Sequence, residues 1–169
     1  MAGLVRYHVL FVIRLANWKV NMAGIIPEPD GEWMKQMARN LTDCEDGFLL
    51  ECRYLIHERA TLFTGDFTPI LERMGVKSVH LPARLPNMNA FAERFVRTIK
   101  SECLSRMILI GAGALRRAVG QFFEYYHGER SHQGLESKVI EAEFASTSEG
   151  KVECCEWLVG SLRYYYLAI

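Results

Sequence analysis

Apolar and polar positions in the first part of the chain follow the patterns of two strands and a helix. In residues 5–15, apolar side chains occupy both faces of an extended segment, which is typical of a central, buried strand. A second extended run at residues 19–26 follows a short turn and ends at Pro27, so the two runs predict a hairpin. Asp30 then caps a helix whose apolar residues recur at helical spacing up to Leu41.

The next segment continues this alternation of strands and helices. Residues 52–58 predict a short buried strand, and a helix follows that opens at Thr64 or Asp66 and stops at Gly75. Residues 76–81 predict another strand. The order β-β-α-β-α-β indicates a mixed α/β fold in which crossover connections follow an antiparallel hairpin.

Two amphipathic helices and a polar tail are predicted beyond a loop rich in proline and asparagine. An apolar stripe running from Ala92 to Cys103 marks the first helix, and a second stripe extends from Leu115 to Tyr126. The chain then becomes acidic and ends in an aromatic cluster. We therefore expect a core domain at residues 1–135 and, at residues 136–169, an acidic linker with an aromatic tail whose end docks or pairs as a strand.

Composition fits a globular protein, and charge is distributed unevenly along it. The 169 residues include 20 Lys and Arg against 20 Asp and Glu, and half of all residues are hydrophobic. Residues 84–132 carry eight basic and four acidic side chains, so the middle of the chain is locally cationic. Such a face is what phosphate contact requires, although a solvated helix face has the same composition.

The cysteines and the apolar runs indicate the redox environment of the protein and whether it meets a membrane. The five cysteines form an odd set without a C-x-x-C pair, which favours reduced thiols over disulfides or a zinc cluster. No apolar run approaches the roughly 20 residues of a membrane-spanning helix, and the first residues lack the pattern of a signal peptide. We expect a cytoplasmic protein without a membrane partner.

Two carboxylates occupy positions suited to phosphoryl transfer. Glu58 ends a buried strand and Glu93 lies early on a helix, 35 residues later. Carboxylates on rigid elements can hold Mg²⁺ or Mn²⁺, which activates a hydroxyl or water and stabilises a leaving oxygen. The structural alternatives are an ion pair of Glu58 with Arg59 and an i,i+4 ion pair of Glu93 with Arg97.

Three motifs in order resemble those of a known family. They are LIHERATLF at residues 55–63, LPNMNAFAERFVRTIKSECL at residues 85–104 and YHGERSHQGL at residues 126–135. Over residues 5–135 the chain resembles an integrase catalytic core of the DDE transposase/retroviral-integrase superfamily, nearest to bacterial insertion-sequence transposases. The resemblance implies a ribonuclease-H-like fold, with a mixed β-sheet flanked by helices, and DNA integration by Mg²⁺-dependent phosphodiester transesterification.

The resemblance assigns Glu58 to the second catalytic acid and Glu93 to the third, and two departures from the family pattern predict impaired catalysis. The second acid is normally aspartate, and the additional methylene of glutamate displaces the carboxylate by roughly 1 Å, a scale of error that costs about 10²-fold in rate. The first catalytic aspartate is absent, because no aspartate lies on a strand ahead of Arg6. We therefore expect a core truncated at its N-terminus that lacks its first strand, with weakened metal binding.

The resemblance also implies DNA contacts around the third acid. Arg97 and Lys100 follow Glu93 by four and seven residues, which places all three on one helix face. We expect Arg97 and Lys100 to contact the DNA backbone, with solvated charges as the structural alternative. The preceding loop resembles the mobile active-site loop of the family, and its DNA-binding candidates are Arg84, Asn87 and Asn89, for which turn formation is the alternative.

The third motif implies a structural role near the site. Tyr126, Arg130 and His132 are expected to fix the end of their helix against the active-site face. The expected partners are DNA and either a second copy of the chain or an intact transposase. The alternative function is a non-enzymatic DNA-binding or subunit-pairing remnant of a decayed insertion element.

Overall fold

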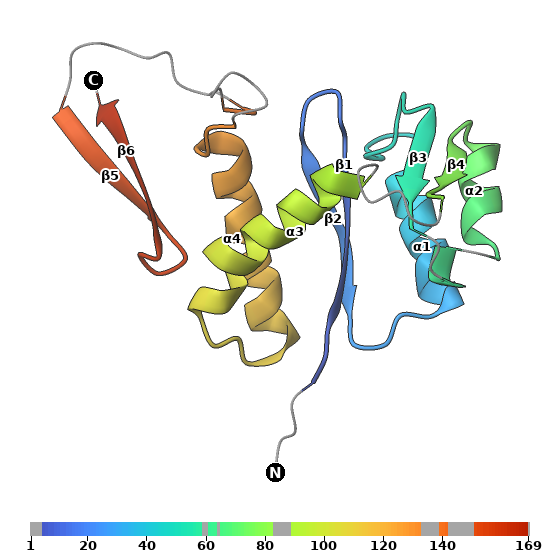
Figure 1. Ribbon diagram of the computed structural model, residues 1–169, viewed down its shortest axis with the longest axis horizontal. Coiled ribbons are helices and arrows are strands. Elements are labelled where there is room, and N and C mark those ends of the chain that lie inside the picture. Colours follow the sequence, from blue (N-terminus) through green and yellow to red (C-terminus); the bar gives the residue numbers. More distant parts are fainter. Residues whose placement is uncertain are drawn as a thin grey trace. The chain divides into compact units, whose positions relative to one another are not determined.

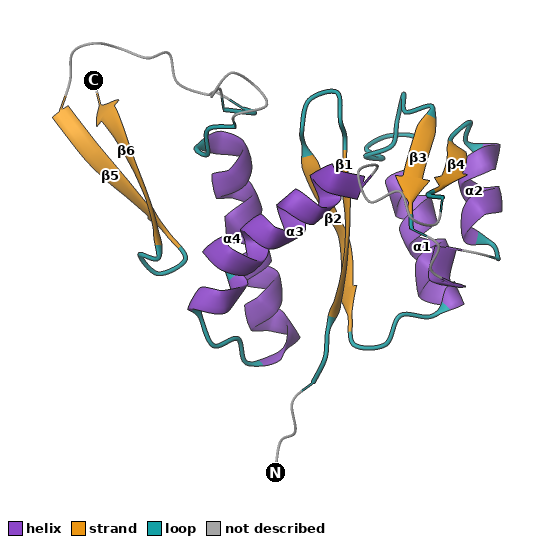
Figure 2. Cartoon of the chain, viewed as in Figure 1, coloured by secondary structure: helices purple, strands orange, loops and turns teal. Residues whose placement is uncertain are grey.

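The computed structural model describes residues 5–58, 61–63, 65–82, 89–132, 139–141 and 151–168 (Figure 1). It divides into two compact units, the first comprising Met1–Val12 and Asn21–Ala92 and the second Ile13–Val20 and Glu93–Ile169. Both units contain helices and strands, so the predicted mixed α/β class is confirmed (Figure 2).

The predicted N-terminal hairpin is present. Strands β1 (His8–Ile13) and β2 (Val20–Ile26) form a two-stranded sheet. The turn between them is closed by the backbone N–H of Arg14, which donates to the carbonyl of Lys19 at 2.8 Å. Apolar residues on both faces had predicted a central strand at residues 5–15, but the sheet that contains β1 has two strands within the described residues, so this expectation is wrong for that part of the chain.

The first unit contains a parallel strand pair with two helices. Its elements are α1 (Gly31–Leu41), β3 (Tyr54–His57), the 3₁₀ turn η1 (Thr61–Phe63), α2 (Phe67–Arg73) and β4 (Lys77–His80). Asp30 caps α1 as predicted, because its carboxylate accepts from the N–H of Trp33 at 2.7 Å. Gly75 adopts φ +81° just after α2, which explains why the helix stops there.

The core of the first unit joins these helices to the strands. Its buried members are Val12, Met34, Ala38, Leu41, Leu49, Phe67, Leu71 and Val76. Strands β3 and β4 pair in parallel, with Leu55 opposite Ser78 and His57 opposite His80. This register fixes the end of β3, where Glu58 follows.

The second unit is built on two helices. Helix α3 (Ala90–Glu102), whose first three residues belong to the first unit, is followed by the 3₁₀ turn η3 (Leu104–Arg106) and helix α4 (Gly111–Gly128). The predicted apolar stripes meet in an aromatic core, in which the ring of Phe95 lies 5.2 to 6.3 Å from those of Phe122, Phe123 and Tyr126.

The chain ends in an antiparallel hairpin formed by β5 (Lys151–Trp157) and β6 (Leu162–Ala168). The prediction that the aromatic end pairs as a strand is confirmed, whereas its partner β5 was not predicted. The indole N–H of Trp157 donates to Glu129 at 2.6 Å, and the guanidinium of Arg106 donates to the carbonyl of Ser161 at 3.3 Å. These bonds attach the hairpin to the helical pair of its own unit.

The described strands pair as three separate two-stranded sheets, β1–β2, β3–β4 and β5–β6. The continuous mixed sheet of a ribonuclease-H-like fold is therefore not observed within the described residues. None of the helices in this part of the chain has the length and apolar character needed to cross a membrane.

Candidate active site and nucleic-acid interface

Glu58 follows β3, and the residue before it anchors the strand end. The buried imidazole of His57 contacts the carbonyl of Glu58 through Nδ1 at 2.9 Å and the hydroxyl of Ser78 through Nε2 at 2.6 Å. Because a carbonyl only accepts, Nδ1 carries the proton and Nε2 accepts from Ser78. Burial lowers the pKa of His57, which favours this neutral form. The backbone that carries Glu58 is thereby fixed to β4.

The Glu58 side chain itself is exposed and has an amide partner. The side-chain N–H of Asn89 donates to Oε1 of Glu58 at 2.8 Å. Asn89 directly precedes α3, so the bond joins the end of β3 to the start of that helix within the first unit. Sequence analysis singled out both residues but assigned Asn89 to DNA and did not predict this contact.

The three predicted residues of α3 lie on its exposed surface. Glu93, Arg97 and Lys100 are exposed, whereas Phe95 and Ile99 are buried. Glu93 belongs to the second unit and Glu58 to the first. That the two carboxylates act together is therefore still a prediction, as are the DNA contacts of Arg97 and Lys100. Arg84 and Asn87 lie outside the described residues.

The carboxylate oxygens of Glu58 and Glu93 are of the type that binds a hard divalent cation. Carboxylate and amide oxygens are the ligands that Mg²⁺ prefers, and Mg²⁺ is often held by one or two carboxylates with water completing its shell. In the described ranges, His, Cys, Asp and Glu side chains do not gather in groups of three or more that could hold a metal ion. The chemistry of the carboxylate donors suits Mg²⁺.

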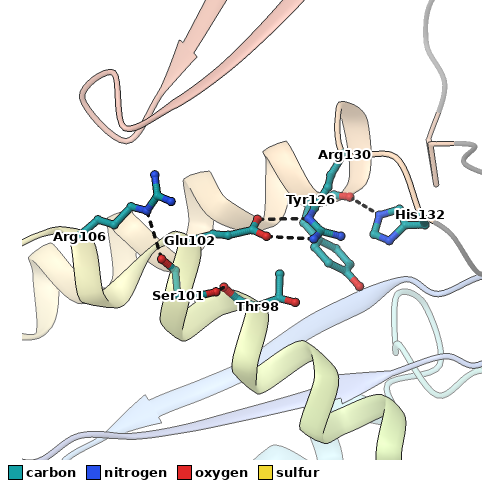
Figure 3. A network of polar contacts seen from close by, with 7 residues as sticks. All are labelled: Thr98, Ser101, Glu102, Arg106, Tyr126, Arg130 and His132. Carbon is teal, nitrogen blue, oxygen red and sulfur yellow. Dashed lines mark hydrogen bonds and ion pairs between the residues drawn. The ribbon is translucent and has the colours of Figure 1, made fainter.

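The third motif forms a polar network at the end of α4 (Figure 3). Arg130 donates from Nε and Nη2 to the two carboxylate oxygens of Glu102, at 3.2 and 2.9 Å. Its guanidinium carbon lies 5.7 Å from the centre of the Tyr126 ring. His132 is buried, and its Nε2 donates to the carbonyl of Tyr126 at 2.9 Å. The network joins α3 to the end of α4.

Glu102 and Ser78 are the partners that sequence analysis missed. Glu102 lies inside the second motif, two residues after Lys100, but its partner Arg130 follows 28 residues later. Because the two residues are so far apart in the sequence, no helical periodicity indicates that they form a contact. The sequence indicates only that Ser78 lies on a predicted strand. Its hydrogen bond with His57 depends on the parallel register of β3 and β4.

Comparison with known families supports an integrase core. Residues 74–139 match the integrase core domain, a family that acts on DNA in integration and transposition and generally uses a divalent metal ion. The match supports an integrase or transposase catalytic core over residues 74–139, and the resemblance drawn from the motifs in this range is confirmed. The match includes Glu93 and the YHGERSH motif and begins after Glu58. No curated protein matches the chain.

Proposed function

We propose that this chain is an integrase-type core that contacts DNA through α3 and whose Mg²⁺-dependent phosphodiester transesterification is impaired. The observation that carries the proposal is the integrase core match over residues 74–139, which contains Glu93, Arg97 and Lys100. All three side chains are exposed on one helix, whose opposite side is buried against α4.

The basic residues of α3 would position the DNA backbone. Arg97 and Lys100 follow Glu93 by one and two helical turns, so the two cations lie along one line of the helix surface. Each cation that meets a phosphate displaces a counterion, which strengthens binding without reading the sequence. Glu93 on the same line repels phosphate when no cation neutralises it. Arg84, Asn87 and Asn89, which precede α3 in the sequence, are further proposed DNA contacts.

Glu58 and Glu93 would be the residues that hold Mg²⁺ or Mn²⁺. When bound, such an ion activates the attacking hydroxyl and stabilises the leaving oxygen of the phosphodiester. The described strands carry no aspartate that could serve as the first catalytic acid beside Glu58 and Glu93. The amide of Asn89 already occupies one oxygen of Glu58. Both features favour weak metal binding and impaired catalysis.

The remaining parts of the proposal follow from the family. We propose a ribonuclease-H-like core, of which the described residues contain the separate strand pairs β1–β2 and β3–β4. Its partners are DNA and a second copy or an intact transposase, and its location is the cytoplasm. The bond between Asn89 and Glu58 also favours a second candidate, a non-enzymatic DNA-binding or subunit-pairing remnant, because this carboxylate has a partner without metal.

A metal titration separates the two candidates. Mn²⁺ binding to the full chain, followed by electron paramagnetic resonance, is compared with binding to the Glu58→Gln/Glu93→Gln double variant. The proposal expects a roughly millimolar site that the double variant lacks. Equal binding by both proteins would support the non-enzymatic candidate.

A strand-transfer assay tests impairment in the same preparations. With Mg²⁺ or Mn²⁺, the chain should give no product above a Glu93→Gln control, because two acids cannot hold a pair of ions. Turnover clearly above that control would contradict the impaired state.

A further inference from the structure

The ion pair between Glu102, the last residue of α3, and Arg130, two residues after α4, joins the ends of these two helices. We propose that Glu102 is a positioning residue: through Arg130 it fixes the C-terminal half of α3 and so presents Arg97 and Lys100 to the DNA backbone. This inference rests on the proposed DNA contact and deepens it. According to this inference, Glu102 strengthens DNA binding although its side chain is acidic.

The geometry of the pair restricts rotation of α3. Both guanidinium bonds end on different oxygens of one carboxylate, at 3.2 and 2.9 Å, so the two planar groups are aligned. The Glu102 and Arg130 side chains are 25% and 28% exposed, which places the pair partly out of water. A lysine at position 130 would keep the charge but lose this two-point contact.

Arg130 is itself held in place by the end of α4. Its backbone N–H donates to the carbonyl of Tyr125 at 3.0 Å, and its guanidinium lies over the ring of Tyr126. His132 holds residues 129–132, which follow α4, against the end of that helix. Its Nε2 donates to the Tyr126 carbonyl, and the rings of His132 and Tyr126 meet edge to face at 4.5 Å. The cation that binds Glu102 is therefore a fixed point.

The position of Glu102 on α3 makes the pair effective for Lys100 and Arg97. Phe95 and Ile99 bury the apolar side of the helix, but apolar contacts are not directional and tolerate small rotations. Glu102 is the last residue of α3, and Arg106 donates to the neighbouring Ser101 carbonyl at 3.1 Å. These directional bonds fix the angle of the final turns, which contain Lys100 and follow Arg97.

The sign of the effect distinguishes positioning from simple electrostatics. Glu102→Gln removes a negative charge near a surface that binds a polyanion, so electrostatics alone expects tighter DNA binding. Positioning expects weaker binding, since the neutral amide cannot accept both guanidinium bonds and α3 gains freedom to rotate. Arg130→Lys leaves the net charge unchanged and weakens only the geometry.

The experiment measures the affinity of the full-length chain for a generic DNA duplex by fluorescence anisotropy across salt concentrations. All proteins are compared at a temperature where circular dichroism shows full helix content. Glu102→Gln and Arg130→Lys should each weaken binding about threefold to tenfold and reduce the log–log salt slope by about one. Glu124→Gln removes an exposed acid of α4 and is the matched charge control, with unchanged or tighter binding.

The Arg97→Ala/Lys100→Ala variant completes the test. Placed on this background, Glu102→Gln should have no further effect if it acts through these two cations. Should the double variant bind DNA weakly while Glu102→Gln and Arg130→Lys bind like the unaltered chain, the positioning role is overturned and the DNA contact stands. Equal affinity of the unaltered chain and the double variant would instead overturn the proposed DNA contact, and the role of Glu102 with it.

Discussion

Two carboxylates that join separate elements, Glu58 and Glu102, are held in very different ways. Glu58 is exposed and accepts one hydrogen bond from the side-chain amide of Asn89. Glu102 is three-quarters buried and accepts two bonds from a guanidinium that an aromatic ring supports. An exposed carboxylate with a neutral partner can exchange that partner for a cation or phosphate-bound metal, whereas a shielded carboxylate paired with Arg is committed to structure. The difference supports our proposal that Glu58 is a site residue and Glu102 a positioning residue.

The surroundings of the two carboxylates reinforce this difference. Around Glu58, the backbone is fixed by His57 and Ser78 while the side chain projects into solvent. Near Glu102, the guanidinium of Arg130 lies over the ring of Tyr126, which contacts the buried ring of Phe122. We infer that changes at the end of β3 alter function with little loss of stability, and that changes at the α3–α4 contact alter both.

Removing an aromatic ring from the helical core should have the largest effect. Phe122 is fully buried, and Phe122→Ala should lower the free energy of unfolding by about 3–5 kcal/mol. Tyr165→Ala is the control, because Tyr165 is 60% exposed on β6 and its removal should cost less than about 1 kcal/mol. Urea unfolding followed by circular dichroism measures both. Similar losses for the two variants would show that the aromatic core does not stabilise the helical pair.

The comparison between the two carboxylates can be tested directly by removing a partner from each. Glu102→Ala should lower the free energy of unfolding by about 2 kcal/mol, because it leaves the charge of Arg130 without its partner in a partly buried place. Asn89→Ala should cost only about 0.5 kcal/mol, since water replaces the amide at the exposed carboxylate. The same urea titration applies. A larger loss for Asn89→Ala than for Glu102→Ala would reverse our assignment of site and structural roles.

A smaller, pH-dependent effect is expected at His127 in the second unit. Its Nε2 accepts the backbone N–H of Val20 at 2.9 Å, so this bond requires the neutral ring, and burial lowers the pKa of His127 below 6.5. Because the unfolded chain binds the proton more readily, stability is complete above about pH 6.5 and falls below it, by up to about 1.4 kcal/mol per pH unit.

The control for this titration is His127→Gln, which can accept the same bond but cannot be protonated. Stability measured between pH 7.5 and about 5 should depend less steeply on pH in this variant. The dependence should not vanish, because burial also lowers the pKa values of His57 and His132. An identical pH dependence in both proteins would exclude His127 as a contributor.

Local patterns were sufficient for the elements up to α4 and for the exposed site residues of α3. Apolar spacing predicted the buried side of α3, and turn chemistry predicted Asp30 as a cap and Gly75 as a stop. The exposed positions of Glu93, Arg97 and Lys100 follow from the same helical period. These features depend on neighbours within about one helical turn, which a sequence displays directly.

The remaining features depend on contacts between distant residues. Arg130 was expected to fix its helix, but the choice of Glu102 over other acids required the packing of α3 on α4. Strand β5 alternates charged and apolar residues weakly, and its pairing with β6 is decided by register. The hydrogen bond from the side-chain amide of Asn89 to Glu58 depends on how the start of α3 meets the end of β3. The spacing of residues in the sequence does not reveal this contact.

The most direct test of the central claim, that α3 is the DNA-contacting helix of an integrase-type core, is the salt dependence of duplex binding without Mg²⁺. We compare the unaltered chain with Arg97→Ala/Lys100→Ala and with Glu93→Gln. The double variant should bind more weakly, with a log–log salt slope lower by about two. Glu93→Gln should bind more tightly, because it removes repulsion of phosphate where no metal neutralises the charge. Equal affinities for all three proteins at every salt concentration would contradict the claim.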